Sequence, residues 1–517
     1  MSFAASAAVE KVPHRGIITI CTMGATLMQA LDQTIANVAL PYMQGSLSAS
    51  FDEITWVLTS YITAAAIMTA PVGWLAQRFG RKQLFVICLV GFTITSMLCG
   101  AAQSLSQMVV FRIMQGVCGA ALVPLSQATL LDIYPVEQRG QAMAIWGVGV
   151  MIGPILGPTL GGYLTEIYNW RWVFYVNLPF GILATGGLLI FMPKSNAQTS
   201  LRFDWIGFAA LSMSIGALQL MLDRGQDQDW FSSREIIVEA VLAGLGLYLF
   251  MVHLFSAKRP FIRPSLFKDR NFSAGLAMMF AMGTILVSSS ALMAPWLQNL
   301  ANFPVETAGL VMAPRGIGTM AAMIIAGRLA SKTDPRKMMA VGVLSLCWSL
   351  WEMTHWTPDV SEGRLILTIM VQGIGLGFVF IPLQVIAFAT LAPALRTDGA
   401  SLFSLLRNIG AAIGVSITSA LLARNTQTLH AEIGAYVTPF NRALQHGAAA
   451  RLWDPANPHS AAALDQLINQ QAQIIAYLDD YKLMIFTTAP ALLLLFFMRR
   501  PRMMAAPQPG SSHAAMD

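Results

Sequence analysis

Apolar runs long enough to cross a lipid bilayer recur from one end of the chain to the other. Because an α-helix rises about 1.5 Å per residue, about 20 apolar residues cross a hydrocarbon core about 30 Å thick. Only 11% of the 517 residues are charged, too few for a soluble domain of this length. The pattern predicts an all-α integral membrane protein with fourteen transmembrane helices, over residues 17–40, 54–76, 83–102, 107–130, 140–163, 172–193, 204–222, 236–255, 272–296, 306–328, 338–356, 364–391, 402–424 and 483–498.

Lysine and arginine are distributed unevenly between the loops. Cytoplasmic loops of membrane proteins carry an excess of these residues. With the N-terminus inside, the inner loops hold basic clusters such as residues 78–82 and 258–270, whereas the short outer loops hold only Arg171, Arg224, Arg234 and Arg364. Both termini are therefore expected to be cytoplasmic. The net charge of +6 reflects this topology and gives no indication of nucleic-acid binding.

Two halves of the chain repeat the same landmarks. Residues 73–82 are echoed by residues 327–336, and Gln115-Gly116 is echoed by Gln372-Gly373. Duplication on this scale is typical of secondary transporters, whose substrate site lies between the repeats. We expect a six-helix bundle over residues 1–200, two linker transmembrane helices over 201–260, a second six-helix bundle over 261–498 and a disordered cytoplasmic tail over 499–517.

One predicted outer loop, over residues 425–481, is much longer than the others. Apolar residues at helical spacing between Ser460 and Tyr481 predict an amphipathic helix there. This helix is either an interfacial segment that leads into the last span or a docking surface for another protein outside the membrane.

Three ionisable residues lie deep inside predicted spans, where a charge is costly and usually functional. Asp32, Arg112 and Arg315 are all placed roughly 8 to 14 Å inside the outer boundary. A carboxyl group whose contact with a guanidinium changes during transport can bind a proton on one side of the membrane and release it on the other. Asp32 and Arg112 are therefore predicted to couple transport to protons, or alternatively to form a static pair that fixes helix register. Arg315 is a candidate for the substrate path.

A stripe of glycines marks the fifth predicted span. Gly149, Gly153, Gly157 and Gly161 recur every fourth residue, so a helix carries them on one face, beside Pro154 and Pro158. Such a face lets two helices approach closely in a membrane. Either the helix bends at this face during transport, or the face forms a close-packed helix pair that does not move.

The inner loop between the second and third spans carries Gly73, Arg78, Gly80 and Arg81. We expect this loop to clamp two helix ends on the inner face. The alternative, that it serves topology alone, explains the charges but not the glycines.

Nothing in the sequence indicates catalysis or nucleotide binding. No lysine directly follows a glycine, which excludes a phosphate-binding loop of the Walker type. The five cysteines lie within predicted spans and lack the spacing of metal ligands. No cofactor, metal ion or enzymatic activity is expected.

These motifs together resemble the major facilitator superfamily, and in particular its fourteen-span drug:proton antiporters of the EmrB/QacA type, closest to the EmrB branch. The segment from Leu31 to Pro41 is similar to the family's first-span motif, whose acid is implicated in coupling. Arg112 is similar to the family's fourth-span arginine, which is assigned to proton transfer. The glycine stripe matches a fifth-span motif of antiporters. The inner loop departs at one position, where Gln77 replaces the usual aspartate.

The resemblance implies a major facilitator fold and a proton-coupled efflux antiporter for hydrophobic toxic compounds in a cell inner membrane. It adds Gln33, Asn37 and Gln115 to the substrate-path candidates. The implied partners are the lipid bilayer, an EmrA-type periplasmic adaptor and a TolC-type outer-membrane channel. Two alternatives stay open, namely a dedicated exporter of one endogenous metabolite or siderophore and a membrane sensor or scaffold that does not transport.

Overall fold

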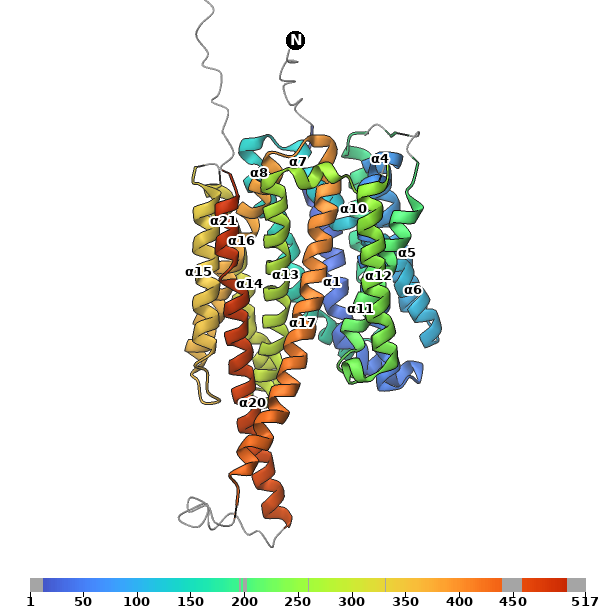
Figure 1. The fold of residues 1–517 in the computed structure, drawn as a ribbon. Coiled ribbons are helices and arrows are strands. Elements are labelled where there is room, and N and C mark those ends of the chain that lie inside the picture. Colours follow the sequence, from blue (N-terminus) through green and yellow to red (C-terminus); the bar gives the residue numbers. More distant parts are fainter. Residues whose placement is uncertain are drawn as a thin grey trace, which may run out of the picture.

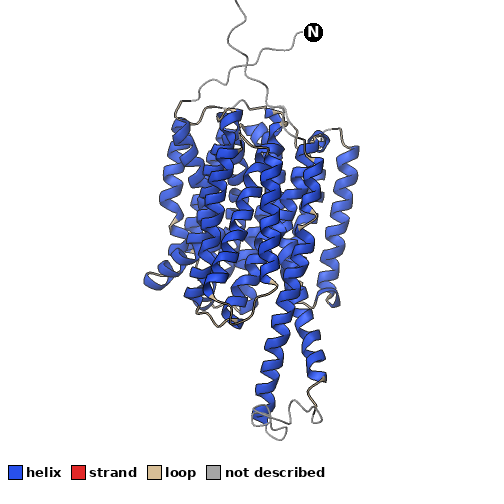
Figure 2. Ribbon diagram, turned by 90° about the vertical axis from the view of Figure 1, so that its left-hand side faces the viewer, coloured by secondary structure: helices blue, strands red, loops and turns tan. Residues whose placement is uncertain are grey.

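The protein is a bundle of long helices. The computed structural model describes residues 13–194, 197–198, 202–258, 260–330, 332–438 and 458–499, and these contain no β-strand (Figure 2). The first half of the chain forms α1 (Arg15–Leu47), α2 (Phe51–Ile54), α3 (Trp56–Thr69), α4 (Val72–Phe79), α5 (Arg81–Ala101), α6 (Leu105–Gly119), α7 (Leu122–Ile133), α8 (Arg139–Ile167), α9 (Trp172–Tyr175) and α10 (Asn177–Phe191). The rest forms α11 (Trp205–Arg224), α12 (Arg234–Ser256), α13 (Arg270–Pro295), α14 (Val305–Leu329), α15 (Pro335–Met353), α16 (Glu362–Ala389), α17 (Arg396–Ala435), α20 (Pro458–Thr488) and α21 (Ala491–Phe497).

Within the described ranges, 11 helices are long and apolar enough to cross a membrane, or 12 if the pair α3 and α4, bent by 60°, counts as one span. The helices α1 and α15 occupy the places of two further predicted spans but are not among these. Helix α1 carries Asp32 between Gln29 and Gln33, and polar residues of this kind lower its mean hydropathy. The protein is thus a multi-pass membrane protein, and the number of fourteen spans stays a prediction.

The long helices run roughly parallel, and their two ends differ (Figure 1). At one end, which we call the basic end, an arginine begins each of α1, α5, α8, α13 and α17. Helix α1 begins and α21 ends at this end, so both termini of the described chain lie on one side. Which side faces the cytoplasm stays a prediction, as do the domain boundaries at residues 200 and 261.

At the opposite end, α17 and α20 project beyond the other helices as an antiparallel pair, which we call the hairpin (Figure 1). The helix predicted between Ser460 and Tyr481 is present as part of the continuous helix α20, which stands along the bundle axis. Whether it lies at the membrane interface or serves as a docking surface stays a prediction. Residues 439–457 and the predicted tail beyond residue 499 lie outside the described residues.

In the part of the chain that the structure describes, buried apolar side chains connect the two halves at the basic end. A single cluster contains basic-end residues of both halves, including Leu130 of α7 and Phe403 of α17. Toward the hairpin end the buried residues separate into one cluster of the first half around Met43 and Phe174, and another of the second half around Trp296. The halves are joined at the basic end and have separate cores at the hairpin end.

Candidate functional site

Asp32 and Arg112 form an ion pair inside the first half. Nη1 of Arg112 lies 2.7 Å from Oδ2 of Asp32, and both side chains have 0% exposure. Asp32 lies on α1, about 26 Å along the helix from its start at the basic end. Arg112 lies on α6, whose first turn is capped by the hydroxyl of Ser104. The structure thus brings together the two residues that the sequence predicts for proton coupling.

A shell of polar groups surrounds the pair. Nε2 of Gln115 donates to Oδ1 of Asp32 at 2.8 Å, and Nη1 of Arg112 donates to Oε1 of Gln115 at the same distance. Nδ2 of Asn177 reaches Oδ1 of Asp32 at 3.4 Å, and Nε of Arg112 donates to the carbonyl oxygen of Val57 at 2.9 Å. Each oxygen of the carboxylate therefore has at least one donor.

The guanidinium of Arg112 is also held by aromatic rings. It lies 4.4 Å from the ring centre of Tyr61 and 5.5 Å from that of Phe174. Its Nη2 is buried and has no hydrogen-bond partner. Because burying a lone charge costs several kcal/mol, Arg112 is stabilised here mainly by the negative charge of Asp32.

This geometry allows one proton to change the pairing of two helices. When Asp32 is ionised, its charge and that of Arg112 cancel in a site without water access. A proton on the carboxyl removes that cancellation, and Arg112 then retains only neutral acceptors, Gln115 and Val57. The favoured response is a rearrangement that lets Arg112 or Asp32 find other partners.

The remaining substrate-path candidates lie apart from this pair. Arg315 on α14 donates from Nη2 to the carbonyl oxygen of Leu286 at 2.8 Å and to Oγ of Ser289 at 2.9 Å, and from Nη1 to Ser290. All three of these partners are neutral oxygens of α13. Gln33 and Asn37 are exposed and lie one turn apart on α1, where Nδ2 of Asn37 donates to the carbonyl oxygen of Gln33.

The glycine stripe packs against the helix that carries Asp32. Helix α8 is continuous through Pro154 and Pro158, and a Cβ on Gly153 would lie 2.7 Å from Cβ of Ala30 on α1. Gly149, Gly157 and Gly161 face Met23, Thr34 and Ile35 of α1 at comparably short range. The close helix pair is thus present in the structure. Whether it bends during transport stays a prediction.

At the basic end, Gly73 allows close contact between the halves. A Cβ on this residue would overlap the side chain of Asp398 at the start of α17. Nε2 of Gln77 donates to both carboxylate oxygens of Asp398, at 3.0 and 3.1 Å. Arg263 contacts Oε1 of Gln77 and lies 3.9 Å from Asp398.

A second polar contact at the basic end involves Asp132 of α7. Its carboxylate pairs with Arg81 of the first half and, at 2.5 Å, with Arg396 of the second half. Gly80 has a φ of 85°, a left-handed conformation that suits glycine, and it separates α4 from α5. Nη1 of Arg78 is buried without a hydrogen-bond partner. Of the predicted clamp residues, Gly73 and Arg81 thus lie where the two halves meet.

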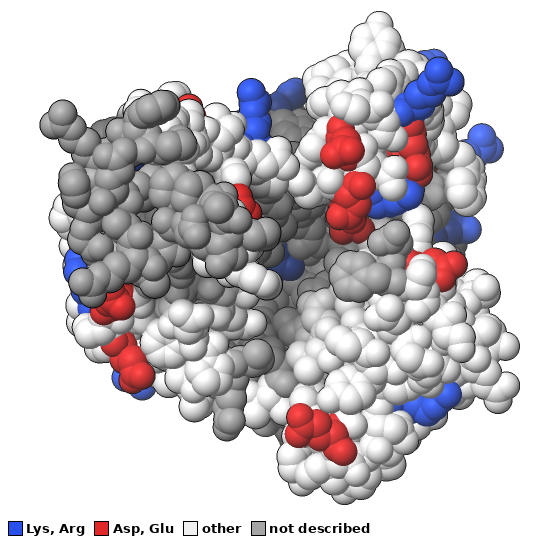
Figure 3. Space-filling view, turned by 90° about the horizontal axis from the view of Figure 1, so that it is seen from below, with Lys and Arg blue, Asp and Glu red and all other residues white. Residues whose placement is uncertain are grey.

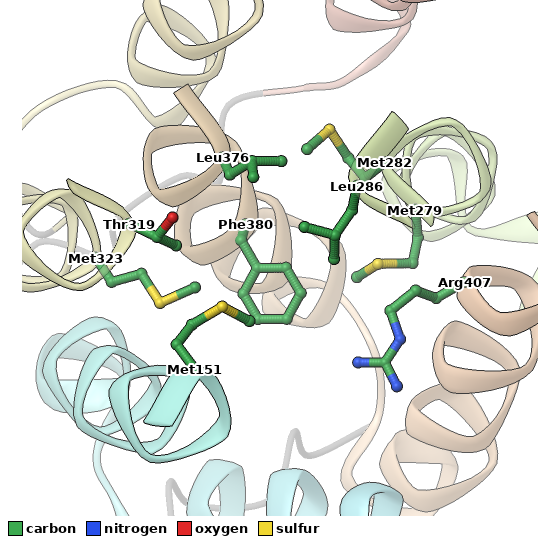
Figure 4. A pocket seen from close by; sticks show the side chains of 9 residues that line it. All are labelled: Met151, Met279, Met282, Leu286, Thr319, Met323, Leu376, Phe380 and Arg407. Carbon is green, nitrogen blue, oxygen red and sulfur yellow. The ribbon is translucent and has the colours of Figure 1, made fainter. Parts of the chain in front are cut away.

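Sequence reasoning missed three charged residues that the structure places at contacts between the halves or in a cavity. Asp132 and Asp398 lie at the basic end, where Asp204, Asp269 and Asp334 also cap helices, so nothing in the sequence singled them out. Arg407 lines a cavity between α8 of the first half and helices of the second half (Figure 4). It lies inside the predicted span 402–424, so the rule that selected Arg112 also applied to it.

The buried groups of the site form a pair of opposite charges. No group of three histidine, cysteine or acidic side chains that could hold a metal ion occurs in the part of the chain that the structure describes.

Comparison with known proteins shows which family this chain resembles. The model of the Major Facilitator Superfamily matches residues 22–415. The multidrug export protein EmrB of Escherichia coli (strain K12) is 37% identical over 433 residues, which cover 82% of this chain and 83% of that protein. The fatty acid resistance protein FarB of Neisseria gonorrhoeae is 35% identical over 466 residues, covering 89% of this chain and 91% of that protein. The human organic anion transporter MFSD10 has a similar fold, with a TM-score of 0.59 at 16% identity, covering 92% of this chain and 99% of that one.

Proposed function

Because the chain belongs to the major facilitator superfamily, as an EmrB-type multidrug exporter of that family, we propose that it exchanges protons for hydrophobic toxic compounds across a cell inner membrane. Superfamily members are transporters and not enzymes, so the question is what drives the export. The single observation that carries the proposal is the fully buried ion pair of Asp32 and Arg112.

Proton binding to Asp32 is the proposed coupling step. A proton that enters from the side outside the cytoplasm adds to a carboxylate oxygen of Asp32 and breaks its pairing with Nη1 of Arg112. When the site later faces the cytoplasm, the proton leaves and the ion pair forms again. One proton that crosses 100 mV supplies about 2.3 kcal/mol, which supports a roughly fifty-fold concentration of substrate.

Helix α8 is the proposed link between the proton site and the substrate. Its glycine face rests on the turn of α1 that includes Asp32, and Oγ1 of Thr34 lies 3.3 Å from the carbonyl oxygen of Gly153. The same helix carries Met151, which lines the cavity between the halves. A shift of α1 that follows protonation is therefore transmitted to the cavity through a contact that contains almost no flexible side chain.

The polar contacts at the basic end are proposed to stabilise one state of the transport cycle. Asp132 and Asp398 each join the first half to the second, and the cores of the halves are separate at the hairpin end. If the basic end is cytoplasmic, as the distribution of lysine and arginine predicts, this state is closed to the cytoplasm. Uptake of a compound then requires that these contacts break.

The hairpin is the proposed contact for an EmrA-type adaptor, which leads to a TolC-type channel. Its two helices project from the bundle, and the end that bears them carries both acidic and basic side chains (Figures 1 and 3). A polar groove between the helices, with His430 and Asp465 paired at 2.9 Å across it, offers many hydrogen-bonding groups to a partner. The groove is lined by Thr426, Gln427, His430, Asp465, Gln466 and Asn469.

Proton release from proteoliposomes tests the proposal. Purified protein is reconstituted without a membrane potential, and a panel of hydrophobic acids and cations is added while the internal pH is recorded. We expect a proton flux that depends on the compound and saturates with its concentration. A protein that binds compounds but moves no protons with any of them would instead favour a different driving force.

A further inference from the structure

Helices α11 and α12, which we call the linker pair, follow the first half in the sequence and contact both halves in space. The two helices pack against each other (Figure 1). Helix α11 also packs against α3 of the first half and against α17 of the second half. The linker pair is thus placed where it can restrain the movement of one half relative to the other.

The chain segments on both sides of the linker pair meet at one residue, Gln77 of α4. The backbone N–H of Gln198, in the segment before α11, donates to the carbonyl oxygen of Gln77 at 2.8 Å. Arg263, in the segment after α12, donates from Nη2 to Oε1 of Gln77. The side chain of Gln77 donates in turn to Asp398 of the second half. Gln77 therefore joins the first half, the linker pair and the second half.

Arg263 determines which way the side-chain amide of Gln77 points. An amide has an acceptor oxygen on one side and a donor NH2 group on the other, whereas a guanidinium only donates. The contact with Arg263 therefore keeps Oε1 on its own side and leaves Nε2 for the two carboxylate oxygens of Asp398. A reversed amide would place Oε1 against the carboxylate, acceptor against acceptor. Arg263 thus acts on Asp398 through Gln77.

Arg263 also supplies positive charge beside a buried acid. The side chain of Asp398 is only 7% exposed, and its Oδ2 lies 3.9 Å from Nε of Arg263. A carboxylate that is buried without a nearby cation is costly. Arg263 therefore stabilises the ionised form of Asp398 where the halves are joined.

A separate set of contacts holds residues 260–263, the segment that carries Arg263, against the linker pair. Oδ2 of Asp204 accepts a hydrogen bond from the backbone N–H of Phe261 at 3.3 Å, and Oδ1 of Asp204 lies 2.8 Å from Nε2 of His253 on α12. The ring of Phe261 lies 6.1 to 6.3 Å from three other rings, those of Phe203, Phe208 and Phe250. The position of Arg263 therefore depends on how α11 and α12 are packed.

We propose that the linker pair controls how firmly the halves are joined at the basic end, and that Arg263 is the positioning residue through which it does so. Withdrawal of Arg263 frees the amide of Gln77 to turn and leaves Asp398 without its nearby cation, so the halves separate more often. As control of a transport cycle this role rests on the proposed function, whereas the contact itself can be tested without transport.

Spin labels at Glu137 and Lys332, which are exposed on opposite halves, test the role of Arg263. Distances are recorded by double electron–electron resonance on protein in nanodiscs, without substrate or gradient. Arg263→Met keeps an unbranched side chain but removes the charge and the donors, and we expect about a fivefold rise in the separated population. Arg263→Lys is expected to retain most of the wild-type distribution. Arg224→Met, which removes an arginine from an ion pair at the other end of the linker pair, is the matched control and is expected to change nothing.

Asp204→Ala tests whether the linker pair acts through Arg263. It removes the anchor of the segment and leaves Arg263 in place, so we expect a smaller rise in the separated population. The double variant with Arg263→Met is expected to be no more separated than Arg263→Met alone. Additive effects would mean that Asp204 acts elsewhere, as the cap of α11, and would overturn the role of the linker pair.

An unchanged distance distribution in Arg263→Met, or equal separation in Arg224→Met, would overturn the assignment of Arg263. Failure of the proposed export function has a different signature, because these distances are measured without a gradient. A protein that separates as expected but moves no protons would retain this control of the basic end and lose the antiport mechanism.

Discussion

Gln77 is the residue at which this chain departs from the motif of its superfamily, and its surroundings give a physical reason. Its amide group donates to both oxygens of Asp398 from the other half. An aspartate at position 77 would face that carboxylate with like charge and without a donor. The contact between the halves is thus preserved here by a neutral donor paired with an acid of the second half.

A charge exchange tests this explanation. Gln77→Glu keeps the size of the side chain but replaces the donor with a second carboxylate, so the halves are expected to separate more often at the basic end. In the double variant with Asp398→Asn, the asparagine donates and the glutamate accepts. This variant is expected to return the distance between the halves to that of the wild type. Spin labels at Glu137 and Lys332, which are exposed on opposite halves at the basic end, report that distance. Equal distances in all three proteins would contradict the role of this contact.

The sequence alone allowed Asp32 and Arg112 to be singled out, but not the contacts between the halves. Asp32 and Arg112 stand out because each is a charge inside an apolar run. Asp398 and Asp132 lie near helix ends, where charges are common, so only the packing of α4 and α7 against α17 reveals their partners. Arg407 is also a charge inside an apolar run, and it lies as far into the predicted span 402–424 as Arg112 lies into the span 107–130, so the same rule could have found it.

Among the elements, the pair α1 and α8 has the most direct bearing on the proposed coupling. The spacing of the glycines predicted a smooth helix face, and the structure identifies its partner as the helix that carries Asp32. That partner could not be read from the sequence, since any helix with small residues fits such a face. The prolines do not break α8, which is continuous from Arg139 to Ile167.

Single alanines on α8 test the importance of that contact. Gly157→Ala places a methyl group where Thr34 lies, whereas at Gly162 no atom lies within 4 Å of the added Cβ. Overpacking typically costs about 1–3 kcal/mol, so Gly157→Ala is expected to lower the melting temperature in detergent and to slow transport. Gly162→Ala, on the same helix, is expected to leave both unchanged. A similar effect of the two substitutions would mean that α8 responds to alanine in general and not to contact with α1.

At the scale of the whole molecule, the cores of the halves merge at the basic end and separate toward the hairpin. In alternating access, a transporter switches between two states. The halves are joined at one end of the molecule in the first state and at the opposite end in the second, so a structure with one joined end matches one of these states. The duplication in the sequence predicted two related halves. It could not predict which end is closed, since that depends on contacts between the halves such as Asp132 with Arg396.

Removal of the hairpin tests the division between transport and assembly. Replacement of residues 427–469 by a short flexible linker removes the projecting helices and leaves the cavity and the proton site intact. We expect unchanged export from proteoliposomes and a loss of drug resistance in cells that contain the adaptor and the channel. Full resistance in those cells would exclude the hairpin as the adaptor contact.

The central claim is that Asp32 carries the proton, and Asp32→Asn tests it most directly, since asparagine keeps the size of the side chain but cannot exchange a proton. Two assays are run on the same proteoliposomes, substrate transport driven by a pH gradient and exchange of labelled for unlabelled substrate without any gradient. The account predicts that the variant loses the driven transport and retains the exchange, which also shows that it is folded. Driven transport at the wild-type rate in Asp32→Asn would contradict the account.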